Sequence, residues 1–186
     1  MIGFLAGGAL ALCGCATSQH MSGTVNGPTY TSPQGGFSVP IPVSPEVGGR
    51  VLSDGPEKVT FHDNWGSRIT FSSVPFKPQS PLTTAPQSQG REQALTEFAK
   101  ISYGDDIVVH YHPATLDGTI SFIFVRPVGP KTGVAMFVHG ARVYGVETDM
   151  LPGVTLLAQN DDLSQNDRLV WLEGRAVTLA QSMDVK

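Results

Sequence analysis

Apolar and polar residues alternate in short runs along much of the chain, a pattern that predicts strands. The run GGFSVPIPVS (35–44) places an apolar side chain at every second position from Phe37 to Val43, so one face of this strand should be buried. Pro40 and Pro42 lack an N–H, which predicts that the strand lies at a sheet edge. Residues 50–54 form a second short strand, and residues 58–74 form a hairpin that turns at 63–66.

A second group of alternating runs follows later in the chain. It predicts four strands, over residues 106–112, 119–127, 133–140 and 142–150. The connections between them are short, and the tightest contains Gly140, so the four strands should form an antiparallel meander. The strand over 119–127 is apolar on both faces, which predicts a central strand that is covered on both sides.

Two segments have the 3- and 4-residue spacing of amphipathic helices. The first, over 91–101, places its apolar residues on one face: Ala94, Leu95, Phe98, Ala99 and Ile101. The second, over 164–183, begins at the N-cap Ser164 and carries an apolar stripe from Leu169 to Met183. Four prolines within residues 75–90 predict a long surface loop before the first helix.

This order of elements predicts an α+β fold, with a mainly antiparallel sheet, a short middle helix and a C-terminal helix in a single domain over residues 36–186. The order, together with the opening GGFSVPIP, resembles the α/β/α sandwich of the Mog1/PsbP-like group, which includes small bacterial envelope lipoproteins. The resemblance covers about residues 30–185. It implies a protein that docks onto larger complexes, and it carries over no catalytic residue.

The first residues have a pattern of their own. MIGFLAGGALAL is apolar over roughly the length of a secretory signal core and is too short to span a bilayer. It ends in Leu12-Cys13-Gly14-Cys15, which resembles the lipobox of bacterial lipoprotein precursors. In a lipobox the residue before the modified cysteine is small, because the peptidase cuts beside a cysteine that already carries a diacylglyceryl group. The resemblance implies that residues 1–14 are a signal peptide and that Cys15 is lipidated.

Two other interpretations of this segment stay open. It can be a buried N-terminal helix or strand, or Cys13 and Cys15 can form a metal or redox site. The second is disfavoured because zinc and iron sites require further ligands, and the chain contains only these two cysteines. Either alternative would leave the chain without a lipid anchor.

Residues 15–35 are rich in Ser, Thr, Gly, Asn and Pro and predict a flexible tether between the anchor and the domain. Acyl chains on Cys15 would hold the protein in the lipid bilayer, because each buried methylene contributes about 0.8 kcal/mol. Ala16 and Thr17 follow Cys15, and the lack of an Asp there resembles sorting to the bacterial outer membrane. We therefore expect an outer-membrane lipoprotein with its domain in the periplasm.

Charge and motifs exclude several other classes. The net charge of −4 argues against a nucleic-acid-binding surface. The sequence contains no run of 18 or more apolar residues, so no transmembrane helix is predicted. The glycines form neither a dinucleotide nor a phosphate loop, so no cofactor is expected. The His139-Gly140 pair resembles part of a lipase oxyanion hole, but no Gly-x-Ser-x-Gly nucleophile accompanies it.

His110 and His112 are the sharpest candidates for chemistry. Residues two apart on a strand point to the same face, so both imidazoles could bind one metal ion. His62 or His139 could add a nitrogen ligand, and Asp105 or Asp106 an oxygen ligand. The alternative interpretation is a pair of polar residues on a solvent-facing strand.

The two tryptophans are candidates for packing or for partner contacts. Trp65 lies in the predicted hairpin turn, where an exposed aromatic could contact a partner, although folding back onto the core is favoured. Trp171 lies beside the stripe of the last helix and is expected in the core.

The function hypothesis is a non-catalytic envelope lipoprotein that binds or stabilises other proteins of a complex. The alternative is a periplasmic metal-binding protein or metal-dependent enzyme that uses His110 and His112. Binding of a small ligand between sheet and helices stays open as a third class.

Overall fold

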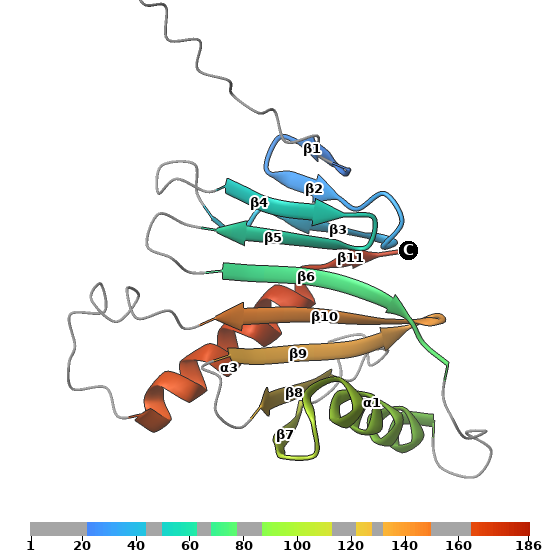
Figure 1. The fold of residues 1–186 in the computed structure, drawn as a ribbon, viewed down its shortest axis with the longest axis vertical. Coiled ribbons are helices and arrows are strands. Elements are labelled where there is room, and N and C mark those ends of the chain that lie inside the picture. Colours follow the sequence, from blue (N-terminus) through green and yellow to red (C-terminus); the bar gives the residue numbers. More distant parts are fainter. Residues whose placement is uncertain are drawn as a thin grey trace, which may run out of the picture.

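Two antiparallel sheets and two helices make up the part of the chain that the computed structural model describes, residues 22–43, 50–62, 68–77, 87–112, 122–127, 132–149 and 165–186 (Figure 1). The small sheet has the strand order β1 (Thr24–Asn26), β2 (Thr29–Thr31), β3 (Phe37–Pro40) and β11 (Asp184–Val185). The large sheet has the order β4 (Arg50–Gly55), β5 (Lys58–His62), β6 (Arg68–Pro75), β10 (Arg142–Asp149), β9 (Thr132–His139), β8 (Phe122–Pro127) and β7 (Ile107–His112). The helices are α1 (Gln87–Tyr103) and α3 (Gln165–Gln181). The predicted α+β class is confirmed.

One face of the large sheet is covered by the small sheet and by α3. Alternation places every second side chain on this face, where an apolar core joins the three layers. Its members include Phe37 from β3, Phe61 and Phe71 from the hairpin, and Ala176 and Ala180 from α3. The small residues of α3 let the helix approach the sheet closely.

The opposite face of the large sheet is covered by α1 over β7, β8 and β9. Leu95 and Ala99 of this helix pack on side chains from the meander, among them Ile123, Val134 and Met136. Strand β8 therefore contributes to both cores, because Phe124 belongs to the core beside α3. The prediction that this strand is covered on both faces is confirmed, but the prediction that it is central is wrong, since it lies next to the edge strand β7.

The predicted hairpin and meander are confirmed by the strand pairing. β5 pairs antiparallel with β6, and β7, β8, β9 and β10 pair in sequence order. Gly140 has φ 57° in the two-residue connection between β9 and β10, a conformation that favours glycine. The tight turn expected at Gly140 is thus present.

The expectation of a flexible tether over 15–35 is wrong for its described part. Residues 24–26 and 29–31 form β1 and β2, and β2 pairs with β3. Tyr30 is completely buried in the core beneath the large sheet. The domain predicted to begin at residue 36 therefore includes residues from Gly23 onwards, since the Gly23 N–H donates to Asp54 of β4 at 2.8 Å.

Three further expectations need correction. Strand β3 lies between β2 and β11, not at an edge, because Pro40 is its last residue and β11 pairs only with Phe37 and Ser38. Helix α1 begins at Gln87, inside the predicted loop, where polar residues hide its first turn from an apolar pattern. Ile101 is 69% exposed, because its position in the helix turns it away from Leu95 and Ala99.

No helix among the described residues is both long enough and apolar enough to cross a bilayer.

Candidate functional site

Strand β7 is one edge of the large sheet and is flanked by both helices. The chain leaves α1 at Tyr103, turns at Gly104 with φ 92°, and enters β7 at Ile107. Side chains of β7 alternate between the two faces of the sheet. Tyr111 contacts α1, where its hydroxyl group lies 3.1 Å from the hydroxyl group of Thr96.

His110 and His112 lie on the other face of β7 and contact α3. His110 Nδ1 lies 2.8 Å from Glu173 Oε2, and His112 Nε2 lies 2.6 Å from Glu173 Oε1. Each carboxylate oxygen of Glu173 thus accepts a hydrogen bond from one imidazole N–H, and the side chain of Glu173 is only 17% exposed. The predicted shared face of the two histidines is present. Its partner is a carboxylate that bridges both rings and ties the edge strand to the C-terminal helix.

The additional metal ligands proposed from the sequence do not gather around these histidines. His62 lies on β5, five strand positions from β7, which corresponds to roughly 24 Å at about 4.8 Å per strand. Asp105 and Asp106 precede β7, at the opposite end of the strand from His112. His139 is exposed at the end of β9. Among the described residues, no group of three or more His, Cys, Asp or Glu side chains is placed to hold a metal ion.

The exposed large apolar side chains of the described residues lie on a few elements. Six large apolar residues of the described part are exposed, and four of them belong to β7 and its flanking helices: Ile101, Tyr111, Val170 and Trp171. Trp171 is 47% exposed and lies beneath the Arg175 guanidinium, with 5.1 Å between Cζ and the ring centroid. The expectation that Trp171 is in the core is wrong, because Leu172 occupies the buried position next to it. We call strand β7 together with the exposed side chains of Ile101, Val170 and Trp171 the β7 end.

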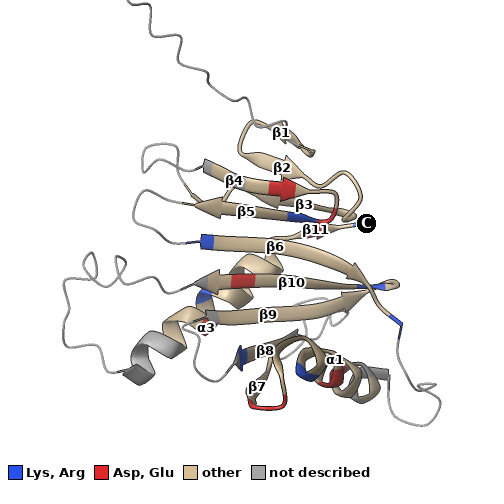
Figure 2. Ribbon diagram, viewed as in Figure 1, with Lys and Arg blue, Asp and Glu red and all other residues tan. Residues whose placement is uncertain are grey.

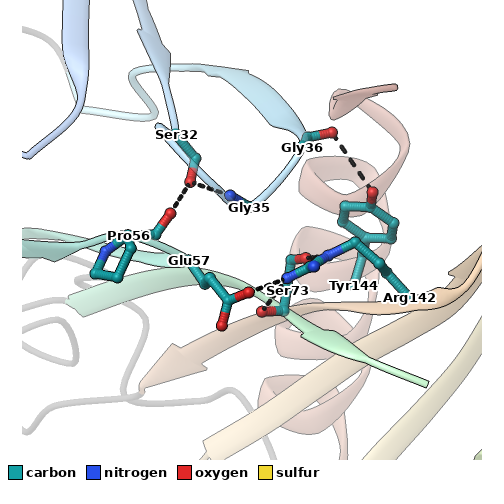
Figure 3. Close-up of polar contacts among 8 residues, drawn as sticks. All are labelled: Ser32, Gly35, Gly36, Pro56, Glu57, Ser73, Arg142 and Tyr144. Atoms are coloured by element: carbon teal, nitrogen blue, oxygen red, sulfur yellow. Dashed lines mark hydrogen bonds and ion pairs between the residues drawn. The ribbon is translucent and has the colours of Figure 1, made fainter. Parts of the chain in front are cut away.

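A second polar cluster holds the two sheets together near the turn between β9 and β10 (Figure 3). Arg142 donates to the side chain and the backbone carbonyl of Ser73, and it forms an ion pair with Glu57 at 2.5 Å. Across from this group, Ser32 donates to the Pro56 carbonyl at 2.9 Å. These contacts join the small sheet, the β4–β5 turn, β6 and β10, so their role is structural.

Three tyrosines have perturbed acidities: Tyr30 and Tyr144 are buried, and Tyr103 is partly buried. Burial and, to a smaller extent, the nearby Glu147 carboxylate together raise the pKa of Tyr103 to about 12. Burial also raises the pKa of Tyr30, helped by the Asp54 carboxylate that accepts its hydrogen bond. Burial raises the pKa of Tyr144, while Arg142 acts in the opposite direction. All three phenols stay protonated at neutral pH and serve as packing groups or hydrogen-bond donors.

Three of the candidates from the sequence lie outside the described residues, namely Cys13, Cys15 and Trp65. The residues that sequence reasoning missed are Glu173, which joins the two histidines, and the Arg142–Glu57 pair. Glu173 is 61 residues from His112 in the chain, so only the packing of α3 against the sheet reveals the contact. No short-range pattern in the sequence predicts the contact between Glu173 and the two histidines.

No protein-family model matches the chain, and no curated protein matches it. Among solved structures, the chain is similar to a mutant of the protein Mog1, with 8% identity, a TM-score of 0.45, and coverage of 81% of this chain and 91% of that one. It is also similar to the solution structure of cyanobacterial PsbP (CyanoP) from Synechocystis sp. PCC 6803, with 11% identity, a TM-score of 0.47, and coverage of 85% and 91%. The proposals below rest on the residues of this chain.

Proposed function

We propose that this chain is a lipid-anchored protein of the bacterial outer membrane that binds other proteins through the β7 end and catalyses no reaction. The observation that carries the proposal is that four of the six exposed large apolar side chains of the described residues lie on the edge strand β7 and on the helices α1 and α3. Apolar and aromatic residues with a polar rim are typical of protein-binding surfaces, and Trp, Tyr and Arg are the residues most enriched in their hot spots.

The arrangement of the molecule agrees with an anchored protein. The described chain begins at β1, and β1 and β7 lie at opposite ends of the longest axis (Figure 1). An acylated Cys15 would attach the protein near the β1 end. The β7 end would then point away from the lipid surface, where a partner protein can reach it.

The polar groups near β7 position the edge strand. Each of the two histidines forms one hydrogen bond to a different carboxylate oxygen of Glu173 on α3. The cluster therefore fixes the position of the edge strand relative to α3.

The anchor is tested by metabolic labelling with radioactive palmitate. We expect label in the full-length chain and in the Cys13→Ser variant, and no label in the Cys15→Ser variant. The Cys13→Ser variant is the matched control because it changes the only other cysteine. Persistence of label in the Cys15→Ser variant would contradict the proposed anchor.

The binding surface is tested by photo-cross-linking in intact cells. A photoreactive phenylalanine analogue replaces Trp171 in one strain and Val25, an exposed residue of β1, in a control strain. We expect discrete cross-linked protein adducts from position 171 and none from position 25. Equal adduct yields at both positions, or no adduct at position 171, would contradict the proposed surface.

A further inference from the structure

The two edges of the large sheet are built differently. The register of β4 shifts between Val51 and Ser53. This strand also carries two charged residues, Arg50 and Asp54, and Asp54 accepts a hydrogen bond from the Gly23 N–H. Bulges and charges are the devices by which proteins prevent an edge strand from pairing with another chain. Strand β7 has neither: its six residues, IVVHYH, pair with β8 without a shift and contain no proline, lysine, arginine or carboxylate.

Among the described residues no strand pairs with the outer edge of β7, so this edge is suited to accept another strand. In an edge strand, every second residue directs its N–H and C=O away from the neighbouring strand. Tyr111 is 55% exposed. The other β7 residues on the same face of the sheet, Ile107 and Val109, are apolar. A strand added beside β7 would cover Tyr111 and would extend the face on which α1 packs.

The polar groups at the two ends of β7 indicate what that strand is. Asp105 and Asp106 are exposed at its beginning, and the acidic residues mark this turn in Figure 2. His110 and His112 stand at its end. A strand that runs antiparallel to β7 would best carry imidazoles at its end and carboxylates at its beginning, and β7 itself has that sequence.

We propose that β7 pairs antiparallel with β7 of a second copy of this chain, with Val109 opposite Val109 of the second copy. In this register Tyr111 covers Ile107 of the second copy, on the face where α1 packs. On the other face, His112 lies opposite Asp106 of the second copy. The twofold axis repeats both contacts, so every residue of β7 obtains a cross-strand partner and the two large sheets become one continuous sheet.

Other registers satisfy fewer groups. A shift that centres the pairing on His110 removes Asp106 from His112 and places two imidazoles opposite each other. A shift that centres it on Val108 leaves Tyr111 opposite the carboxylate of Asp105. The register centred on Val109 combines the apolar contact of Tyr111 with the contact between Asp106 and His112.

This inference rests on the proposed function in one respect, because it takes the β7 end as a protein-binding surface and names the partner. It is tested first by disulfide cross-linking of the full chain in its membrane. Antiparallel neighbours have Cα atoms about 4.5–5.5 Å apart, which suits a disulfide. We expect the Val109→Cys variant to form a dimer on oxidation that reductant reverses.

The matched control is Ser53→Cys, an exposed position on the opposite edge strand β4. We expect this variant and the unsubstituted chain to form at least about tenfold less reducible dimer than the Val109→Cys variant. Equal dimer yields in Val109→Cys and Ser53→Cys would overturn the proposed pairing.

A second measurement tests self-association without an introduced cysteine. Two differently tagged full-length copies are produced in one cell and purified through one tag in detergent. We expect co-purification of the second copy, its loss by at least about tenfold in the Tyr111→Lys variant, and its retention in Val25→Lys, whose residue is also exposed but lies on β1 of the small sheet. Equal recovery in both variants, or no co-purification of the parent chain, would overturn the proposal.

The two proposals fail in different ways. If the chain does not self-associate while position 171 still cross-links to another protein, the self-pairing is wrong and the protein-binding surface stands. If self-association is found and the adducts at position 171 are a second copy of this chain, both are supported. If neither is observed, the proposed surface and its proposed partner are both wrong.

Discussion

At the scale of single residues, Glu173 is the side chain on which the position of the edge strand depends. It accepts hydrogen bonds from two histidines of β7 while its own backbone belongs to α3. Because both bonds are lost together, we expect Glu173→Ala to lower the free energy of unfolding by about 1–2 kcal/mol, less than for a fully buried pair since His110 is half exposed.

Denaturant unfolding of the full chain measures this effect. The control is Glu97→Ala, which changes an exposed glutamate of α1 and should shift the free energy of unfolding by less than about 0.5 kcal/mol. Equal effects in the two variants would show that the carboxylate of Glu173 does not hold β7 to α3.

Alanine substitutions at two glycines, Gly133 and Gly174, should change the stability of the fold in opposite directions. A Cβ at Gly133 would overlap the buried ring of Phe124, whereas a Cβ at Gly174 on the exposed side of α3 would meet no atom within 4 Å. We expect Gly133→Ala to destabilise the fold by about 1–3 kcal/mol and Gly174→Ala to stabilise it by about 0.5–1 kcal/mol. Thermal unfolding of both variants checks the signs, and a stabilising Gly133→Ala would contradict the packing of β9 against β8.

Tyr103 predicts how stability depends on pH. Its folded-state pKa of about 12 lies above the value of about 10 in an unfolded chain. The unfolded chain therefore loses this proton first, and the stabilising contribution is complete below pH 10 and declines as the pH rises from 10 to 12. We expect Tyr103→Phe to lose less stability over this interval than the parent chain. Unfolding curves at several alkaline pH values test this, and identical losses would contradict it.

At the scale of elements, alternation in the sequence located most strands of the large sheet because each buries one face. It failed for β1 and β2, where Val25 is exposed and Tyr30 is the single large buried side chain. The Asn26-Gly27 pair, with φ 56° at Gly27, was the available signal for this hairpin. Composition alone suggested a tether there, although one buried tyrosine is enough to fix the hairpin on the core.

The hairpin of β1 and β2 is tested through that tyrosine. Tyr30 is completely buried, makes an edge contact with Phe61, and donates a hydrogen bond to Asp54. We expect Tyr30→Ala to lower the free energy of unfolding by about 3–5 kcal/mol, and Val25→Ala to change it by less than about 0.5 kcal/mol. Equal and small effects would restore the interpretation of this segment as a tether.

The surroundings of His110 and His112 could also be predicted only in part from the sequence. Spacing placed His110 and His112 on one face of a strand, and the structure agrees. Which residue meets them depends on how α3 crosses the sheet, and helical periodicity alone does not determine that. Periodicity also left Trp171 ambiguous, since it lies one position from the buried Leu172.

At the scale of the whole molecule, the fold separates two ends. The small sheet lies near β4 at one end of the large sheet, and β7 is the edge strand at the other end (Figure 1). An anchor near β1 and a binding strand at β7 would use this length to hold a partner away from the bilayer. The central claim is therefore that other protein covers β7 in the native membrane.

Amide hydrogen exchange of the full chain tests this claim most directly. It is measured in native membrane vesicles and again after extraction and dilution in detergent, with β4 as the internal control because it is the opposite edge of the same sheet. We predict that the amides of Ile107–His112 exchange at least about tenfold more slowly in the vesicles, while those of Arg50–Gly55 change little. Equal exchange of the β7 amides under both conditions would contradict the account.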